Sequence, residues 1–243
     1  MRKLFALVLT LVLVLMATAC KAGKEDAQSP AVNEPTLQEN SSAELFPEGV
    51  NVTEAEKESI GIVSLNDLMN ASPTDVNELY LMGSSDTEYW VSGYYGTSPI
   101  LVIPEEYQGA PITAVTQYAL GASSVAEALR INDSCTELQD FACYGSEFLK
   151  IVVFGSNVKS VGESAFMNCG ELETVVLNEG LEDVAFAAFA GCKNLESITI
   201  PETVTNIEAA VFQECHEDFT IYGEAGSYAE TFAAENGIPF VAQ

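Results

Sequence analysis

The chain has 243 residues, with 9 Lys or Arg against 36 Asp or Glu, so its net charge is −27. A chain this acidic repels nucleic acid and anionic lipid. No Lys or Arg lies between Lys57 and Arg130, so the long central stretch has no basic patch and we exclude a nucleic-acid partner.

The first twenty residues form a targeting segment. Arg2 and Lys3 precede an apolar run over residues 4–16, and small residues at 17–19 lead to Cys20. This is the layout of a secretory signal, and the run is too short for an ordinary membrane span. The small residues before Cys20 resemble a bacterial lipobox, which implies cleavage before Cys20 and lipid attachment to it. We therefore predict a signal peptide over 1–19 and a stable anchor of more than one acyl chain; a plain signal peptide with a chance cysteine is the alternative.

Residues 20–45 are predicted to be a flexible tether. The segment is polar, contains Pro30 and Pro35, and has few large apolar residues. Such a chain has a typical end-to-end distance of about 25–30 Å, which holds a folded domain clear of the lipid headgroups. No later stretch reaches 18 apolar residues, so we expect no other membrane span.

Residues 46–103 carry weaker signals. Thr53 and Glu56 match a capping box, and residues 64–70 are compatible with another helical turn. Residues 88–94 alternate and contain Trp90, residues 96–98 are typical of a turn, and residues 99–103 read as a second strand. We expect these two strands to form a hairpin that covers the first repeat, because the end repeats of a solenoid otherwise expose their core.

Residues 104–217 contain a repeat of 23 residues. Six columns of apolar or small residues keep this spacing without insertion from position 112 to 215. One column consists of Ile131, Phe154, Leu177 and Ile200. A second consists of Leu120, Cys143, Phe166, Phe189 and Phe212. A single unit of this length cannot bury its own apolar columns, so successive coils must stack around a continuous core, with parallel strands about 4.8 Å apart.

The repeat consensus reads L-x-x-I-x-I-P-x-x-V-x-x-I-x-x-x-A-F-x-x-C, and the copies at 195–215 and 161–169 match it well. This pattern resembles the BspA-type leucine-rich repeat family of bacterial surface proteins. The resemblance covers about residues 90–243 and implies an α/β leucine-rich repeat solenoid, strand-rich, with a parallel β stack. Asn132, Gly155 and Asn178 depart from it where the family carries Pro.

Residues 218–243 resemble the C-terminal cap of that family, which implies a helix and a strand. Ser227 and Glu230 match a capping box, and Asn236 with Gly237 ends the predicted helix. Tyr228 and Phe232 are spaced i,i+4 and are expected to pack together on the last coil.

The cysteines and the single histidine give no sign of chemistry. Cys135, Cys143, Cys169, Cys192 and Cys215 all fall in core columns, and stacked neighbours have parallel Cβ directions that suit a disulfide poorly, so we expect free thiols. His216 adjoins Cys215, but sequence neighbours rarely point the same way. We expect no enzyme activity, no metal and no cofactor, because no catalytic or metal-ligand motif is present.

Binding is expected on the outward positions of the repeat strands. These are Ala128, Ile151, Thr174 and Ser197 in one row, and Arg130, Val153, Val176 and Thr199 in the next. Ile151, Val153 and Val176 are predicted to form an exposed apolar strip, a feature that often marks an interaction site; ordinary β-propensity on a sheet surface is the alternative.

Three functions remain open at this point. The family resemblance implies a surface-exposed, lipid-anchored module, expected to be monomeric, that adheres to an unidentified protein or cell-surface partner. A structural envelope lipoprotein is a second possibility. A glycan-binding module is the third, with Trp90, Tyr94 and Tyr95 as stacking rings, unless those rings form the core of the N-terminal cap.

Overall fold

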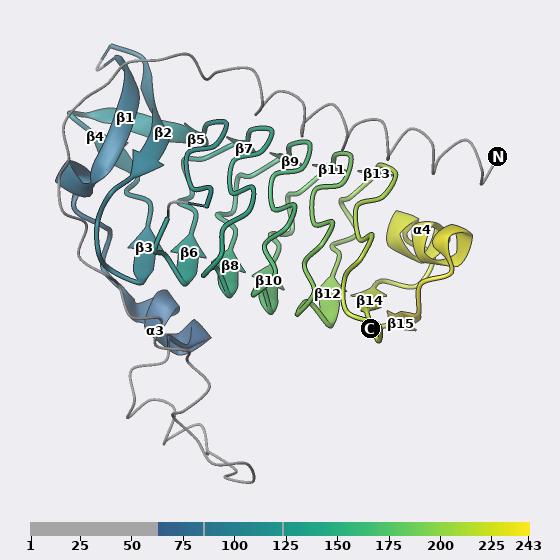
Figure 1. The fold of residues 1–243 in the computed structure, drawn as a ribbon. Helices are drawn as coiled ribbons and strands as arrows, with labels where there is room; N and C mark the ends of the chain where they lie inside the picture. The colour runs from purple at the N-terminus through teal and green to yellow at the C-terminus, as the bar shows by residue number, and fades with distance from the viewer. Residues whose placement is uncertain (1–62, 85, 123) are drawn as a thin grey trace, which may run out of the picture. The chain divides into compact units, whose positions relative to one another are not determined.

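The computed structural model describes residues 63–84, 86–122 and 124–243. The predicted signal peptide, Cys20, the tether and the helix expected at Thr53 lie outside the described residues. The described chain forms an elongated stack of coils with β1 and β2 at one end and α4 at the other (Figure 1). Among these residues, no helix is long and apolar enough to cross a membrane.

Short strands dominate the architecture. The helical elements are α3 (Leu65–Asn70), the 3₁₀ turn η2 (Val76–Glu78) and α4 (Tyr228–Asn236). The first strands are β1 (Leu79–Ser84), β2 (Glu88–Tyr94), β3 (Ile100–Val102), β4 (Glu106–Tyr107) and β5 (Ala110–Val115). The repeats supply β6 (Ala128–Arg130), β7 (Glu137–Leu138), β8 (Ile151–Val153), β9 (Ser160–Val161), β10 (Thr174–Val176), β11 (Asp183–Val184), β12 (Ser197–Thr199) and β13 (Asn206–Ile207). The chain ends with β14 (Thr220–Gly223) and β15 (Phe240–Ala242) around α4.

Each coil contributes one strand to each of two surfaces. One surface is an eight-stranded sheet in the order β1-β2-β5-β7-β9-β11-β13, with β4 paired to β5. The other, here called the repeat-strand sheet, consists of β3, β6, β8 and β10 in one hydrogen-bonded group and β12, β14 and β15 in the next. β10 and β12 lie side by side, so the two groups form one row along the stack (Figure 1).

The strand register confirms the 23-residue coil. Ala128 pairs with Ile151, Ile151 with Thr174, and Ser197 with Thr220, each 23 residues apart and in parallel. The first coil is longer, because Ile100 pairs with Ala128. Backbone N–H groups connect successive coils, as where Ile131 donates to the Val153 carbonyl at 2.9 Å.

The interior is the single continuous core that the columns predicted. Ile131, Phe154 and Ile200 are buried, and Leu177 packs against the same cluster while half-buried. Phe166 lies flat on Phe189 with ring centroids 5.2 Å apart and 1° between the ring planes. The Phe189 and Phe212 centroids are 5.9 Å apart, which continues the stack towards α4. The fold is thus a strand-rich leucine-rich repeat solenoid.

The cysteine column has a polar role that the repeat pattern did not reveal. The Sγ atoms of Cys169, Cys192 and Cys215 lie 3.1, 3.2 and 3.3 Å from the carbonyls of Cys143, Phe166 and Phe189. Ser146 makes the same bond to Leu120 one coil earlier. The Cys143, Phe166 and Phe189 carbonyls also accept backbone N–H groups, so each thiol is a second donor to a carbonyl of the preceding coil. All five cysteines of the described chain are free; four are buried and Cys215 is half-buried.

The N-terminal hairpin differs from the prediction. β2 pairs antiparallel with β1, whereas β3 lies in the other sheet and pairs with β6. The expected hairpin of residues 88–94 with 99–103 is therefore wrong. The connection between them passes from one sheet to the other, as it does in every later coil, so the first coil begins at β2 and β1 covers its edge.

The C-terminal cap contains the predicted helix and strand. Ser227 caps α4 by accepting from the Glu230 N–H, and Gly237 ends the helix with φ +68°. Glu230 does not complete the capping box, because its carboxylate accepts from the N–H of Gly226 instead. Phe232 packs on the ring of Phe212 as expected, and Tyr228 on the same helix is 40% exposed.

Candidate functional site

The outward side of the repeat-strand sheet carries two rows of side chains. The parallel register places Ile100, Ala128, Ile151 and Thr174 in one row, which Ser197 and Thr220 continue. The same register places Val102, Arg130, Val153 and Val176 in the other, which Thr199, Tyr222 and Val241 continue. This is the face on which the sequence predicted binding.

The first half of this face is covered by α3. Ser64 and Asp67 form a capping box at the start of the helix, as the polar residues in its first turn allow. The side chain of Leu68 is fully buried in a small apolar cluster apart from the main core. That cluster contains Val63, Leu68, Val102, Ala128, Ile151 and Val153, with Ala71 and Ile100 against it.

Polar contacts hold the same segment to the sheet. The Arg130 guanidinium donates to the carbonyls of Met69 and Ala71 at 2.9 and 3.0 Å, at the C-terminal end of α3. A cation there also interacts favourably with the helix dipole. The Thr74 N–H donates to the Val102 carbonyl at 2.9 Å, and the Val102 N–H donates back to Thr74 Oγ1 at 3.0 Å.

These contacts correct one prediction. Ile151 and Val153 are each only 7% exposed, so the expectation that they form an exposed apolar strip with Val176 is wrong. Their outward side chains are covered by the chain's own N-terminal segment. Arg130 is likewise engaged with α3.

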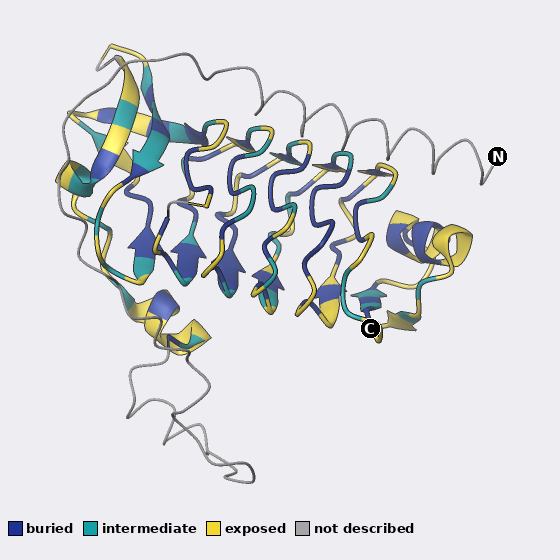
Figure 2. Ribbon diagram, in the orientation of Figure 1, coloured by how far each residue is buried: buried dark blue, intermediate teal, exposed yellow. Residues whose placement is uncertain are grey.

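The second half of the face is open (Figure 2). Val176 is 40% exposed, Ser197 and Thr199 are exposed, and Thr174 is half-buried. The rows continue through β14 and β15, where Thr220 and Tyr222 are half-buried and Val241 is 44% exposed. We call the set Thr174, Val176, Ser197, Thr199, Thr220, Tyr222 and Val241 the open face. The sequence signal for Thr220 and Tyr222 was present, since they lie one period after Ser197 and Thr199.

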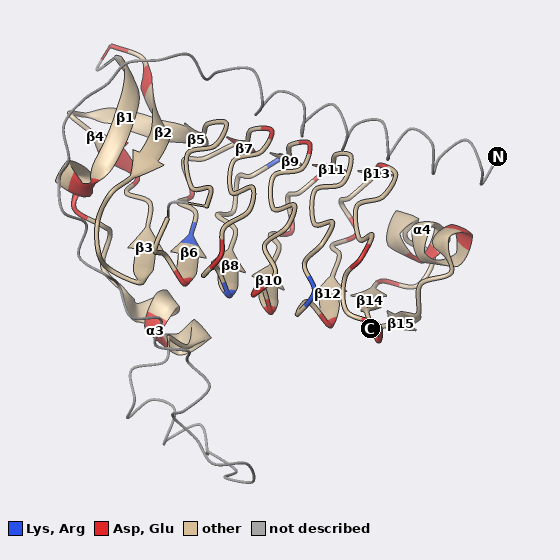
Figure 3. Ribbon diagram, viewed as in Figure 1, with Lys and Arg blue, Asp and Glu red and all other residues tan. Residues whose placement is uncertain are grey.

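Acidic residues lie before and after the strands of the open face in the chain, in the part of the ribbon where red segments recur (Figure 3). Glu173, Glu196 and Asp218 precede β10, β12 and β14, and all three are exposed. Glu179, Glu202 and Glu224 follow the same strands and are also exposed. We call these six residues the acidic rim.

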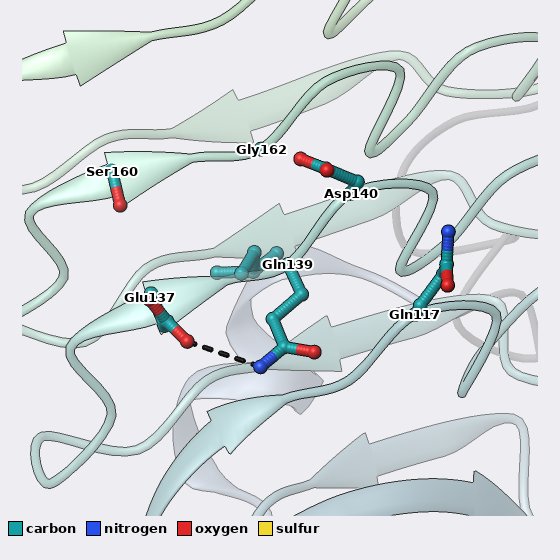
Figure 4. A pocket seen from close by; sticks show the side chains of 7 residues that line it. Gln117, Glu137, Gln139, Asp140, Ser160 and Gly162 are labelled. Atoms are coloured by element: carbon teal, nitrogen blue, oxygen red, sulfur yellow. Dashed lines mark hydrogen bonds between the residues drawn. The ribbon is translucent and has the colours of Figure 1, made fainter.

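A polar hollow of about 340 Å³ lies over the eight-stranded sheet (Figure 4). It is lined by Gln117, Glu137, Leu138, Gln139, Asp140, Ser160 and Gly162. Glu137 accepts from Gln139 Nε2 at 3.1 Å, and Asp140 Oδ1 accepts from the Glu163 N–H at 2.8 Å. The Asp140 carboxylate thus bonds the backbone of the next coil, and among the described residues no hydrogen bond joins the Ser160 hydroxyl to Glu137 or Asp140.

The aromatic side chains proposed for glycan stacking do not form one surface. Tyr94 is buried and its hydroxyl donates to the Ser98 carbonyl, whereas Tyr95 is 55% exposed. A different group gathers at the coil turns, where the rings of Tyr118 and Phe141 stack at 5.3 Å and Tyr144 meets Phe141 edge-on at 5.8 Å. Tyr118 and Phe141 hold equivalent turn positions with φ of 59°, which Ser164, Ala187 and Ala210 occupy in later coils.

Cys215 and His216 do not form a catalytic pair. Cys215 Sγ donates to the Phe189 carbonyl, and His216 Nδ1 accepts from the Asp218 N–H at 3.2 Å. Burial raises the pKa of Cys215 to about 12, so the nucleophilic thiolate is scarcely populated at neutral pH.

Burial also governs the other thiols. It raises the pKa values of Cys135 and Cys169 to about 12 and those of Cys143 and Cys192 well above the ordinary range. In the described part of the chain, no group of three or more His, Cys, Asp or Glu is placed to hold a metal ion.

Comparison with known proteins identifies the repeat. Residues 108–220 match the family described as BspA type Leucine rich repeat region, in six copies. Residues 108–220 are therefore BspA-type leucine-rich repeats. The match includes strands β6 to β13 of the stack, and with them most of the open face.

Solved structures show the same fold. A leucine-rich repeat protein of T. pallidum aligns with a TM-score of 0.59 and 19% identity, over 62% of this chain and 71% of that protein. A leucine rich cell surface protein of Faecalibacterium prausnitzii aligns with a TM-score of 0.51 and 24% identity, over 65% of this chain and 47% of that protein. This chain therefore spans only about half of the second, longer protein. No curated protein is similar enough in sequence to count as a relative.

Proposed function

We propose that this chain is a lipid-anchored bacterial surface protein whose solenoid binds a partner protein through the open face, without catalysing a reaction. The open face carries the proposal, because it is the part of the outward sheet that α3 leaves uncovered. Solenoids bind partners through extended faces of this kind. The repeat family and the F. prausnitzii protein, which is called a cell surface protein, support placement outside the cytoplasm.

The composition of the open face supports protein binding rather than simple solvation. Val176, Tyr222 and Val241 supply apolar and aromatic area, and the hydroxyls between them supply hydrogen-bond donors and acceptors. Tyrosine is among the residues enriched at protein–protein interfaces. A non-catalytic role fits the raised pKa of Cys215 and a Ser160 hydroxyl that is not hydrogen-bonded to either carboxylate of the polar hollow.

Binding is tested with the purified mature chain against host matrix proteins, cell-envelope fractions and a glycan array. Val176→Arg with Thr199→Arg is expected to abolish binding of a protein partner without lowering the melting temperature. The charge-matched control is Thr136→Arg with Thr205→Arg, two exposed positions outside the open face. Equal binding by wild type and the open-face variant would show that the partner binds elsewhere.

Anchoring is a separate part of the proposal and is tested at Cys20. Metabolic labelling with an alkynyl fatty acid should tag the wild-type chain and not Cys20→Ser. The variant should leave the membrane fraction, because lipid chains supply the membrane affinity. A Cys20→Ser chain that stays in the membrane fraction would show that the anchor lies elsewhere.

Glycan binding is a second candidate because of the aromatic group at Tyr118, Phe141 and Tyr144. Tyr118 is 57% exposed and stacked on Phe141, so a flat ring face is presented at the surface. The faces of sugar rings are apolar and pack on such rings. Glycan-array binding that is lost in Tyr118→Ala and retained in the open-face variant would favour this function over protein binding. A mature chain that binds neither proteins nor glycans would instead support a structural role in the envelope.

A further inference from the structure

The two halves of the repeat-strand sheet differ in net charge, and only one of them is covered by α3. The covered half includes Arg130, and Lys150 pairs with Glu127 at 2.9 Å beside it. Residues 171–224, which contain the open face through β14, hold twelve Asp or Glu and one basic residue, Lys193. Of the two halves of this sheet, the uncovered one is therefore the half whose negative charge is less compensated by Lys and Arg (Figure 3).

The acidic rim is not neutralised by the protein itself. Among the described residues, no Lys or Arg forms an ion pair with its six members, and the Nε2 atom of His216 lies 4.0 Å from a carboxylate oxygen of Glu196. The Glu196 side chain is 74% exposed. These carboxylates are free to pair with charges on another molecule.

The covered half shows how this sheet face holds a polypeptide. Leu68 packs with Ala128 and Ile151, and the Arg130 side chain donates to main-chain carbonyls. Thr74 bonds the edge strand β3 twice, by donating its N–H to the Val102 carbonyl and by accepting the Val102 N–H at Oγ1. The open face continues that interface in register, since Val153 under α3 pairs with Val176 beside it. An apolar and hydroxyl surface of the same width therefore extends beyond α3.

We propose that the open face binds an extended, positively charged segment of the partner protein, an inference that rests on the proposed function. Lys and Arg side chains would lay their aliphatic stems over Val176 and Tyr222 and place their charges at the acidic rim. The ring of Tyr222 also offers a cation–π contact. A second copy of this chain fits poorly, because both surfaces would be acidic, and anionic partners are repelled.

The test uses the full mature chain and a fluorescent ten-residue probe in which Lys alternates with Thr, with a second probe in which Gln replaces Lys. Binding is followed by anisotropy between 50 and 300 mM NaCl. We expect binding of the Lys probe to weaken steeply with salt, because exposed charges are screened over about 8–10 Å. Equal binding of the Gln probe would overturn the inference.

Two charge-matched variants distinguish binding at the acidic rim from a general attraction of the Lys probe to an acidic protein. The rim variant is Glu173→Gln, Glu196→Gln and Glu202→Gln, and the control is Glu137→Gln, Glu163→Gln and Asp183→Asn, three exposed carboxylates away from the open face. The rim variant should weaken the Lys probe about tenfold, as expected for three exposed charge pairs, and the control less than about threefold. Equal losses would overturn the inference.

The site is located by hydrogen exchange with the Lys probe bound. We expect new protection in β10, β12 and β14; protection confined to other parts of the chain would overturn the inference. The proposed function fails separately. A partner protein that the open-face variant loses, but whose binding ignores both salt and the rim variant, would refute the cationic segment and leave protein binding by the open face intact.

Discussion

Replacing Leu68 with Ala should release α3 from the sheet without unfolding the solenoid. Leu68 is fully buried in the apolar cluster that α3 shares with the sheet. Removing a buried leucine side chain costs about 2–3 kcal/mol where the site can relax. A helix of six residues is not stable alone, so this loss falls directly on docking. The open population of α3 should rise about 30- to 150-fold.

Hydrogen exchange measures this population amide by amide. The N–H groups of Leu68, Ala71 and Thr74 bond to Ser64, Leu68 and Val102, so they exchange only when the segment opens. In Leu68→Ala, the protection of these three amides against exchange should fall about 30- to 150-fold. The Ile131 N–H, which bonds the Val153 carbonyl between coils, should keep its protection.

A neighbouring variant controls for effects on the helix itself. Met69→Ala changes a side chain of the same helix that is 51% exposed, and it should leave exchange at 68–74 within about twofold of wild type. Unchanged protection at 68–74 in Leu68→Ala would refute the reasoning, because Leu68 would then not hold the segment. Loss of protection throughout the coils would refute it equally, since α3 would then be part of the main core.

Three further predictions concern the stack. Phe189→Ala should lower the free energy of unfolding, measured by urea titration, by about 3–5 kcal/mol, because this ring is fully buried. Phe148→Ala, at a 49% exposed position, should change it by less than about 0.5 kcal/mol. Equal effects would place Phe189 outside the core. Gly155→Ala should lower the free energy of unfolding by about 3 kcal/mol, because the new Cβ would lie 1.9 Å from the Asn132 carbonyl oxygen of the preceding coil. Gly170→Ala, whose Cβ would have no atom within 4 Å, should leave it nearly unchanged. Similar melting temperatures for the two variants would argue against such close coils. Burial raises the pKa values of the thiols from 9.0 to about 12, so unfolded thiols ionise at lower pH than folded ones. The free energy of unfolding should be independent of these thiols at pH 7 and should fall as pH rises through 9.0 towards about 12, by up to about 1.4 kcal/mol per pH unit for each thiol. Urea titrations at pH 7–10.5 that gave a flat profile would contradict the burial.

The repeat could be predicted because its information is local and recurrent. Phe166, Phe189 and Phe212 occupy one column of an uninterrupted period, and a column of large apolar side chains has only the shared interior in which to lie. The free thiols followed from the same register. Their hydrogen bonds to carbonyls of the preceding coil did not, because the pattern records residue size but not the direction of a donor.

The division of the sheet face could not be read from the sequence. Residues 64–70 were predicted as a possible helical turn, but the docking of Leu68 and Val63 joins residues far apart in the chain and has no periodicity. Arg130 looked free because its position is outward, yet the carbonyls that it binds lie about sixty residues earlier in the chain. An outward position on a strand predicts exposure only when no other segment covers that strand.

The same reasoning explains the error at the N-terminal hairpin. Residues 88–94 and 99–103 have the alternation and the turn that favour a hairpin. In a solenoid, however, each coil already contains a corner between its two sheets. β2 and β3 occupy such a corner, and the strand that covers β2 is the preceding one, β1.

The central claim is that α3 closes one half of the repeat-strand sheet and leaves the other half available to a partner. The most direct measurement is the rate at which a maleimide labels a cysteine placed on each half, Ile151→Cys or Thr199→Cys, in a chain whose Cys20 is replaced by Ser. The native thiols of the repeats are mostly buried, and burial raises their pKa values, so they should react slowly. We predict rapid labelling of Thr199→Cys and labelling of Ile151→Cys at least about 30-fold slower, unless Leu68→Ala is added. Equal rates at the two positions in the otherwise unchanged chain would contradict the claim.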